Sequence, residues 1–227
     1  GMEDRLIGRR ETLRTGVALA KIDADGNAVY DILRPAAWDE ITLSDSEMAD
    51  ARRADAIVFG SLAARSPRNR DTLLALLDGY PGYKFCDVNL RAPYDSIERA
   101  RRLAGLAVLV KLNDDELFRM LGRKRESSRK AREAAARDCA ALLGVSAVVV
   151  TLGGEGALAY RDGQFVTRPA VPVDVVDTIG AGDAFTAAFV DAHLCGAGLE
   201  DSILAALRLG SFVAGRSGAQ PKHETDA

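Results

Sequence analysis

Residues 177–185 have the sequence DTIGAGDAF, and the rest of the chain can be arranged around them. Apolar residues 171–176 lead into this stretch as a strand or an extended segment, and residues 184–194 follow it with apolar positions at helical spacing. The small residues Gly180, Ala181 and Gly182 therefore stand where a helix begins. Unpaired backbone N–H groups and the positive end of the helix dipole favour an anion at such a place.

Asp183 adds a carboxylate beside this expected anion site. A carboxylate repels phosphate, but it suits a group that takes a proton from a hydroxyl attacking the phosphate. The alternative is structural, since an acidic side chain in the first turn of a helix stabilises it by about 0.3–1 kcal/mol through the dipole. For an isolated G-x-G-D pattern both interpretations stay open.

Residues 177–185 as a whole are more specific, because they resemble the signature of the ribokinase/PfkB family of sugar and nucleoside kinases. The surrounding chain is similar to the fructokinase-like branch. The resemblance implies a three-layer α/β/α ribokinase-like fold, with a mostly parallel sheet and a small β lid hairpin. It also implies that ATP phosphorylates a primary hydroxyl of a small sugar, fructose first among the candidates. Asp183 would be the catalytic base beside the sugar, and the amides of Gly180, Ala181 and Gly182 would form the anion hole.

Composition limits the partners. The 227 residues, 48% of them hydrophobic, can bury the core of one α/β domain, alone or with a small appendage. Thirty basic and 33 acidic residues give a net charge of -3, so we expect neither a nucleic-acid nor a membrane partner. The cysteines Cys86, Cys139 and Cys195 lack metal-ligand spacing, which indicates reduced thiols in a cytoplasm, with buried packing as their expected role.

Residues 14–33 predict a hairpin, with a strand over 14–23, a turn at 25–27 and a returning strand over 28–33. It could be an edge hairpin of the main sheet. The resemblance instead makes it a lid over the sugar, and because such lids form dimer contacts, a homodimer through the lid is an expectation. The expected organisation is a lead-in over 1–13, the lid hairpin and its return over 14–38, the α/β kinase core over 39–221 and a tail over 222–227.

Polar residues follow the strand predicted over 83–87, at a place where open α/β sheets bind ligands. On the residues alone, Asp87, Asn89 and Arg91 form an Asp/Asn-rich turn with a surface arginine. Their similarity to the D-x-N-x-R segment of the family implies instead that Asn89 and Arg91 lie near the sugar and the triphosphate. Arg91 would then offset phosphate charge.

The strand predicted over 107–112 is followed by Asn113 and Glu116. This spacing is a helix-capping pattern, in which Asn113 caps the helix and Glu116 reaches back to it. The same two side chains could hold a hydrated Mg²⁺ that bridges nucleotide phosphates. They also resemble the N-x-x-E motif that the family uses for magnesium and phosphate, and the two roles are compatible.

A glycine-rich turn follows the apolar strand predicted over 147–151. Glycines there can be simple turn formers. The pattern T-L-G-x-x-G resembles the nucleotide loop of the family, which implies that Thr151, Gly153 and Gly156 approach ATP. The sequence has no G-x-x-x-x-G-K-[ST], which excludes a P-loop NTPase, and no G-x-G-x-x-G that follows a strand and opens a helix, which disfavours a dinucleotide dehydrogenase.

Two further features are assigned on weaker patterns. The basic stretch 119–132 has no interleaved aromatic residues, which favours a solvated loop and helix start over a nucleic-acid surface. His193 and His223 have no partner spacing for a metal or for catalysis, and we expect surface or packing roles. The resemblance also implies a K⁺ site of backbone carbonyls, which corresponds here to Asp177, Ile179, Val213, Arg216 and Gly218.

Relatives in the family begin with a further βαβ segment, which carries an Asp and a Gly-Gly-x-x-x-Asn that grip the sugar hydroxyls. This sequence contains no counterpart of those residues. Either a segment outside the sequence supplies them, or the chain is a truncated nucleotide-binding homologue without catalysis. A kinase for a nucleoside or a sugar acid is a further alternative within the same fold.

Overall fold

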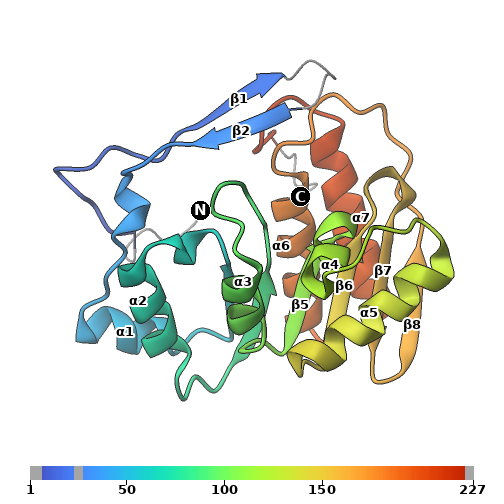
Figure 1. The fold of residues 1–227 in the computed structure, drawn as a ribbon, viewed down its shortest axis with the longest axis horizontal. Coiled ribbons are helices and arrows are strands. Elements are labelled where there is room, and N and C mark those ends of the chain that lie inside the picture. The colour runs from blue at the N-terminus through green and yellow to red at the C-terminus, as the bar shows by residue number, and fades with distance from the viewer. Residues whose placement is uncertain (1–6, 23–27, 223–227) are drawn as a thin grey trace. The chain divides into compact units, whose positions relative to one another are not determined.

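The computed structural model describes residues 7–22 and 28–222, and the chain divides into two compact units, Gly1–Leu106 and Ala107–Ala227 (Figure 1). The predicted turn at 25–27, His223 and nearly all of the predicted tail lie outside the described residues. No helix that the structure describes is both long enough and apolar enough to span a membrane.

The first unit contains a hairpin that forms a two-stranded antiparallel sheet of its own. Its strands are β1 (Ala18–Ile22) and β2 (Ala28–Ile32), and neither pairs with a strand of the main sheet. The alternative of an edge hairpin in the main sheet is therefore wrong. The first strand begins at Ala18 rather than at residue 14, although Leu33 N–H still donates to Val17 O.

Two parallel strands and short helices make up the rest of the first unit. The strands are β3 (Ala56–Gly60) and β4 (Tyr83–Asp87). The helices are α1 (Asp45–Ala51), α2 (Pro67–Leu77) and α3 (Ile97–Ala104), with 3₁₀ turns η1 (Ala37–Asp39) and η2 (Ala63–Arg65). Ser44, Ser66 and Ser96 each cap a helix, and the predicted Ser-Pro start of α2 is confirmed.

Four strands and four helices, with a 3₁₀ turn, form the described part of the second unit. The strands are β5 (Leu109–Asn113), β6 (Ala147–Thr151), β7 (Ala157–Arg161) and β8 (Gln164–Arg168), and the turn is η3 (Gly153–Glu155). The helices are α4 (Asp114–Leu121), α5 (Arg129–Leu143), α6 (Ala181–Leu194) and α7 (Leu199–Ala214). Helices α4 and α5 pack on β5–β7. Helix α7 packs on β7 and β8, and α6 packs against α7, on the other side of the strands in Figure 1. Val148, Val149 and Val150 of β6 are fully buried, as expected for a strand covered on both faces.

One row of paired residues crosses the sheet of the second unit where β5 and β6 end. Asn113 pairs with Thr151 in parallel, Thr151 pairs with Ala157 and Ala157 pairs with Arg168 in antiparallel register. The polar residues that follow β5, the glycine turn that follows β6 and the segment that follows β8 therefore meet at the same edge. This edge carries the candidate site.

Several predicted details differ from the structure. Residues 169–175, all of them described, join no strand ladder, so of the two expectations for 171–176 the strand is wrong. Cys86 and Cys139 are buried as expected, but Cys195 is exposed because it follows the end of α6. His193 stacks on Phe189 with ring centroids 6.1 Å apart, a packing role, and its burial lowers the pKa of the imidazole.

Candidate functional site

A cavity of about 670 Å³ lies at this edge of the second unit. Such a volume is typical of small-molecule sites. Its lining comes from the paired strand ends, the glycine turn, the segment after β8 and the two C-terminal helices. The lining residues are Asn113, Thr151, Gly153, Gly154, Gly156, Ala170, Val171, Pro172, Val173, Val175, Thr178, Ala181, Gly182, Phe185, Leu207, Gly210, Ser211 and Ala214.

The start of α6 forms one wall of the cavity. Gly180 is the N-cap with φ +80°, and a Cβ there would lie 2.7 Å from Ala219 O, so the position requires glycine. Ala181 and Gly182 line the cavity, while Asp183 is exposed in the same helical turn. The predicted anion-hole residues thus stand at a helix N-terminus beside a cavity, where the dipole favours negative charge.

Asp177 ties the entry to α6 to the segment that follows α7. Its carboxylate accepts hydrogen bonds from the N–H groups of Ile179 (2.9 Å) and Gly218 (3.2 Å). Its own N–H donates to Ala214 O at 3.2 Å, and Val213 O accepts from Arg216 N–H at 3.0 Å. The residues predicted for a K⁺ site are therefore brought together in two hydrogen-bonded segments.

Asn113 and Glu116 form the predicted capping box at the start of α4. Glu116 N–H donates to Asn113 Oδ1 at 2.8 Å, and Asn113 N–H donates to Glu116 Oε2 at 2.9 Å. Within residues 7–22 and 28–222, no group of three or more His, Cys, Asp or Glu side chains could hold a metal. Asn113 lines the cavity, whereas Glu116 is buried behind it, and the pair offers the single carboxylate with which Mg²⁺ can be held when phosphates and water complete its shell.

The glycine turn after β6 closes tightly, with Leu152 N–H donating to Gly156 O at 2.8 Å. Gly153 and Gly156 have φ values of +59° and +107°, and a Cβ on Gly156 would clash with the Arg168 carbonyl. Both glycines line the cavity together with Thr151. The three residues predicted from T-L-G-x-x-G therefore lie on one wall, where bare backbone can approach a ligand.

Asn89 and Arg91 belong to the first unit, just beyond the end of β4. Asn89 has φ +50°, and its buried Oδ1 has no hydrogen-bond partner in the described chain. Arg91 Nη1 donates to Leu90 O at 3.1 Å. A buried amide oxygen without a partner costs stability, so this position calls for an explanation such as a water, an ion or a functional role.

A family model described as "pfkB family carbohydrate kinase" matches residues 3–226. The chain belongs to this family. Among relatives, the 1-phosphofructokinase of Haloferax volcanii is 36% identical over 154 residues, which is 64% of this chain and 48% of that protein. The fructokinase of Klebsiella pneumoniae is 31% identical over 201 residues, which is 85% of this chain and 62% of that protein. This pfkB family chain thus spans less than two thirds of either relative.

Among solved structures, that of Arabidopsis thaliana ribokinase complexed with ribose and ATP resembles this pfkB family chain with a TM-score of 0.75 and 26% identity. The match covers 92% of this chain and 66% of the ribokinase. The predicted fold class is therefore confirmed as ribokinase-like, a mostly parallel sheet flanked by helices with a separate two-stranded sheet.

Two features at or beside the cavity in this pfkB family chain were not predicted from the sequence. The first is Lys111 on β5, whose Nζ lies 3.4 Å from the position that a Cβ on Gly182 would take. A lysine within a strand as apolar as 109–112 is the signal that could have indicated it. The second is the apolar wall of Val171, Val173 and Val175, which are 41%, 40% and 65% exposed.

Proposed function

We propose that this chain is the nucleotide-binding and catalytic part of a carbohydrate kinase, which transfers the γ-phosphoryl group of ATP to a primary hydroxyl of a small sugar. The observation that carries the proposal is the single cavity that the α6 N-terminus, the glycine turn and Asn113 line together. Membership of the pfkB family supports the reaction class.

The walls of the cavity suit the two ends of a nucleotide. The N–H groups of the first turn of α6 would bind phosphate oxygens, with Lys111 supplying positive charge beside Gly182. Val171, Val173 and Val175 offer an apolar surface for a base. The glycine turn would let backbone N–H groups approach the phosphates without side-chain interference.

In the reaction, Asp183 would take the proton of the sugar hydroxyl as that oxygen attacks phosphorus. The amides at Gly180, Ala181 and Gly182 would stabilise charge on the transferring group. Asn113 and Glu116 would hold Mg²⁺, which neutralises phosphate charge when bound. Carbonyls around Asp177, Ile179, Val213, Arg216 and Gly218 would hold K⁺ and so order the start of α6.

Fructose is the sugar we propose first, with Asn89 and Arg91 on the sugar and phosphate side. A nucleoside is the second candidate, since the aminoimidazole riboside kinase of Salmonella typhimurium is 32% identical over 186 residues. We further propose that residues 14–38 act as a lid over the sugar and as a homodimer contact, that residues 39–221 form the kinase core and that the enzyme works in the cytoplasm.

The test is ATP consumption with magnesium and potassium, across fructose, ribose, 2-keto-3-deoxygluconate and adenosine. Asp183→Asn should lower kcat by about 10²–10⁴-fold, because the base is lost, and leave ATP affinity nearly unchanged. Asp191→Asn, at an exposed position later in α6, is the matched control and should keep full activity. An Asp183 variant that retains most activity would contradict the assignment. If the parent chain binds ATP but consumes none with any of these substrates, the result would favour a non-catalytic nucleotide-binding homologue.

A further inference from the structure

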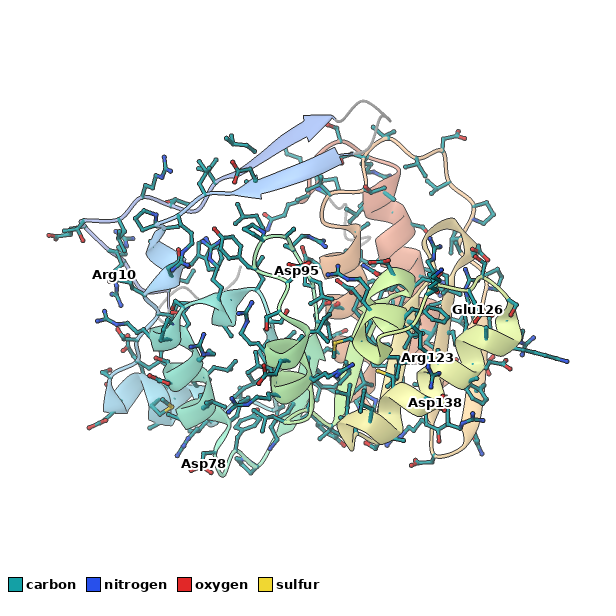
Figure 2. The ribbon with its side chains drawn as sticks, in the orientation of Figure 1. Arg10, Asp78, Asp95, Arg123, Glu126 and Asp138 are labelled. Carbon is teal, nitrogen blue, oxygen red and sulfur yellow. The ribbon has the colours of Figure 1, made fainter. Side chains whose placement is uncertain are left out.

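Arg132 is buried, although the sequence analysis placed it in a solvated basic stretch. Its side chain is 5% exposed, whereas that of Arg129 in the same turn of α5 is 73% exposed. Other arginines of the stretch form pairs at the surface, such as Arg123 with Asp138 at 2.8 Å, both labelled in Figure 2. Burial and the positive end of the helix dipole both oppose a cation at Arg132, so its position requires anionic partners.

Two carboxylates from different segments provide this compensation. Arg132 Nη1 and Nη2 donate to the two oxygens of Glu155 at 2.7 and 2.9 Å. Arg132 Nε and Nη2 donate to the two oxygens of Asp114 at 3.3 and 3.1 Å. One planar guanidinium therefore binds both carboxylates through paired hydrogen bonds, a geometry that a lysine ammonium cannot reproduce.

The ionised state of this cluster is favoured at neutral pH. The hydrogen bond with Glu155 is the largest cause that raises the pKa of Arg132, and it outweighs the opposing effect of burial. The hydrogen bond from Arg132 is likewise the largest cause that lowers the pKa of Glu155. Glu155 is 62% exposed, so the arginine holds an otherwise solvated carboxylate in place.

Each partner of Arg132 is a neighbour in sequence of a residue that lines the cavity. Asp114 follows Asn113 directly, and Glu155 lies between Gly154 and Gly156. The strand pairing between Thr151 and Ala157 ends where the glycine turn begins, so the ladder does not fix the turn itself. Gly156 is packed against the Arg168 carbonyl on one side. Arg132 provides the link to the start of α4.

We propose that Arg132 is a positioning residue, which holds the glycine turn against the start of α4 so that both can bind one nucleoside triphosphate. Its guanidinium sets the spacing between Asn113 and the backbone of Gly153–Gly156 without lining the cavity. This inference rests on the nucleotide site proposed above.

The test compares Arg132→Met, Arg132→Lys and Glu155→Gln with the parent chain. Binding of the non-hydrolysable analogue AMP-PNP with magnesium is measured by calorimetry, and amide hydrogen exchange is followed over residues 152–156. Arg132→Met and Glu155→Gln should weaken binding by about 5–30-fold, with Arg132→Lys between them and the parent. In turnover, KM for ATP should rise with kcat unchanged, whereas a loss of folded protein would lower kcat.

The matched control is Arg129→Met, which breaks the exposed pair with Glu133 (2.7 Å) one turn away on the same helix and should bind as the parent does. If Arg132→Met does not fold, Glu155→Gln carries the test at an exposed side chain. Parent-like affinity and exchange in Glu155→Gln would overturn the proposal. If the parent chain binds no AMP-PNP, the proposed nucleotide site is wrong, and amide hydrogen exchange then tests the role of Arg132 separately. Faster exchange over 152–156 in Glu155→Gln than in the parent supports the positioning role. Unchanged exchange overturns it.

Discussion

Arg65 in the first unit and Arg132 in the second are both buried arginines that grip carboxylates, but their surroundings differ. Arg65 pairs with Asp39 at 2.6 and 2.9 Å, and Asp39 is 5% exposed. Its guanidinium carbon lies 3.9 Å from the ring centroid of Trp38 and 4.4 Å from that of Tyr94. It also donates to the carbonyls of Ile32 and Leu33, at the end of the hairpin. Arg65 therefore holds a closed interior together.

Arg132 has no such enclosure on its Glu155 side. It binds an exposed carboxylate that belongs to a turn on a cavity wall. Substitution of Arg65 should therefore mainly lower the stability of the fold. Substitution of Arg132 should mainly displace the glycine turn. The comparison separates an arginine that maintains a fold from one that positions a site.

The largest loss of stability should come from Arg65→Met, which leaves the buried Asp39 with only the half-exposed Arg34, at 3.7 Å, as a cationic neighbour. We expect the free energy of unfolding to fall by about 3–5 kcal/mol. Trp38 is the single tryptophan of the sequence, so its fluorescence during urea denaturation reports on this cluster. The control is Arg68→Met in the first turn of α2, just after Arg65, whose pair with Glu40 is exposed (3.4 Å) and should contribute less than about 1 kcal/mol. A similarly small loss for Arg65→Met would show that the Arg65 cluster is no more important for stability than an exposed pair, and would contradict the contrast drawn with Arg132.

The second prediction concerns the loss of stability of the Arg65–Asp39 cluster in acid. Burial alone would raise the pKa of Asp39, but hydrogen bonds from Arg65 and from Ala36 N–H, with nearby positive charge, lower it below its usual 3.8. A lowered pKa in the folded state means that the stability is present above the usual pKa and is lost as pH falls through the lowered value. Trp38 fluorescence should therefore show falling stability below about pH 4. Asp39→Asn should be less stable at neutral pH and lose this acid dependence, and an unchanged dependence would assign it to other carboxylates.

The smallest change in stability and in hydrogen exchange should come from Arg125→Ala. Arg125 Nε donates to Asp114 Oδ2 at 2.8 Å, but its side chain is 54% exposed. Of the two carboxylates that Arg132 binds, the structure pairs Arg125 with Asp114 alone. Stability should fall by less than about 1 kcal/mol, and hydrogen exchange over 152–156 should not change. Exchange as fast as in Arg132→Met would show that Asp114, rather than the two-sided grip of Arg132, holds the turn.

The sequence predicted the parts of the molecule whose causes are local. Ser66 and Pro67 mark the start of α2 because capping and the fixed φ of proline act within one turn. Asn113 and Glu116 form their capping box for the same reason. The residues of DTIGAGDAF and of the glycine turn reach one cavity, since strand order and small residues already determine where those turns stand.

Features that depend on distant partners were missed. Arg132 has the same local pattern as its solvated neighbours, and only packing against Asp114 and Glu155 makes it buried. Lys111 could be recognised as unusual in an apolar strand, but its nearness to Gly182 depends on how α6 packs. The apolar run at 171–176 allowed a strand or an extended segment, and the choice depends on whether a neighbouring strand is present to pair with it.

The row of paired residues Asn113, Thr151, Ala157 and Arg168 also shows where the chain can tolerate insertions and deletions. Side chains alternate between the faces of a strand, so one residue added or removed within β5–β8 would exchange the residues of the two faces beyond that point. The connection between α4 and α5, residues 122–128, and the Asp162–Gly163 turn lie outside the ladders and away from the cavity lining. Changes of length can accumulate in those two places while the strand ends stay in register.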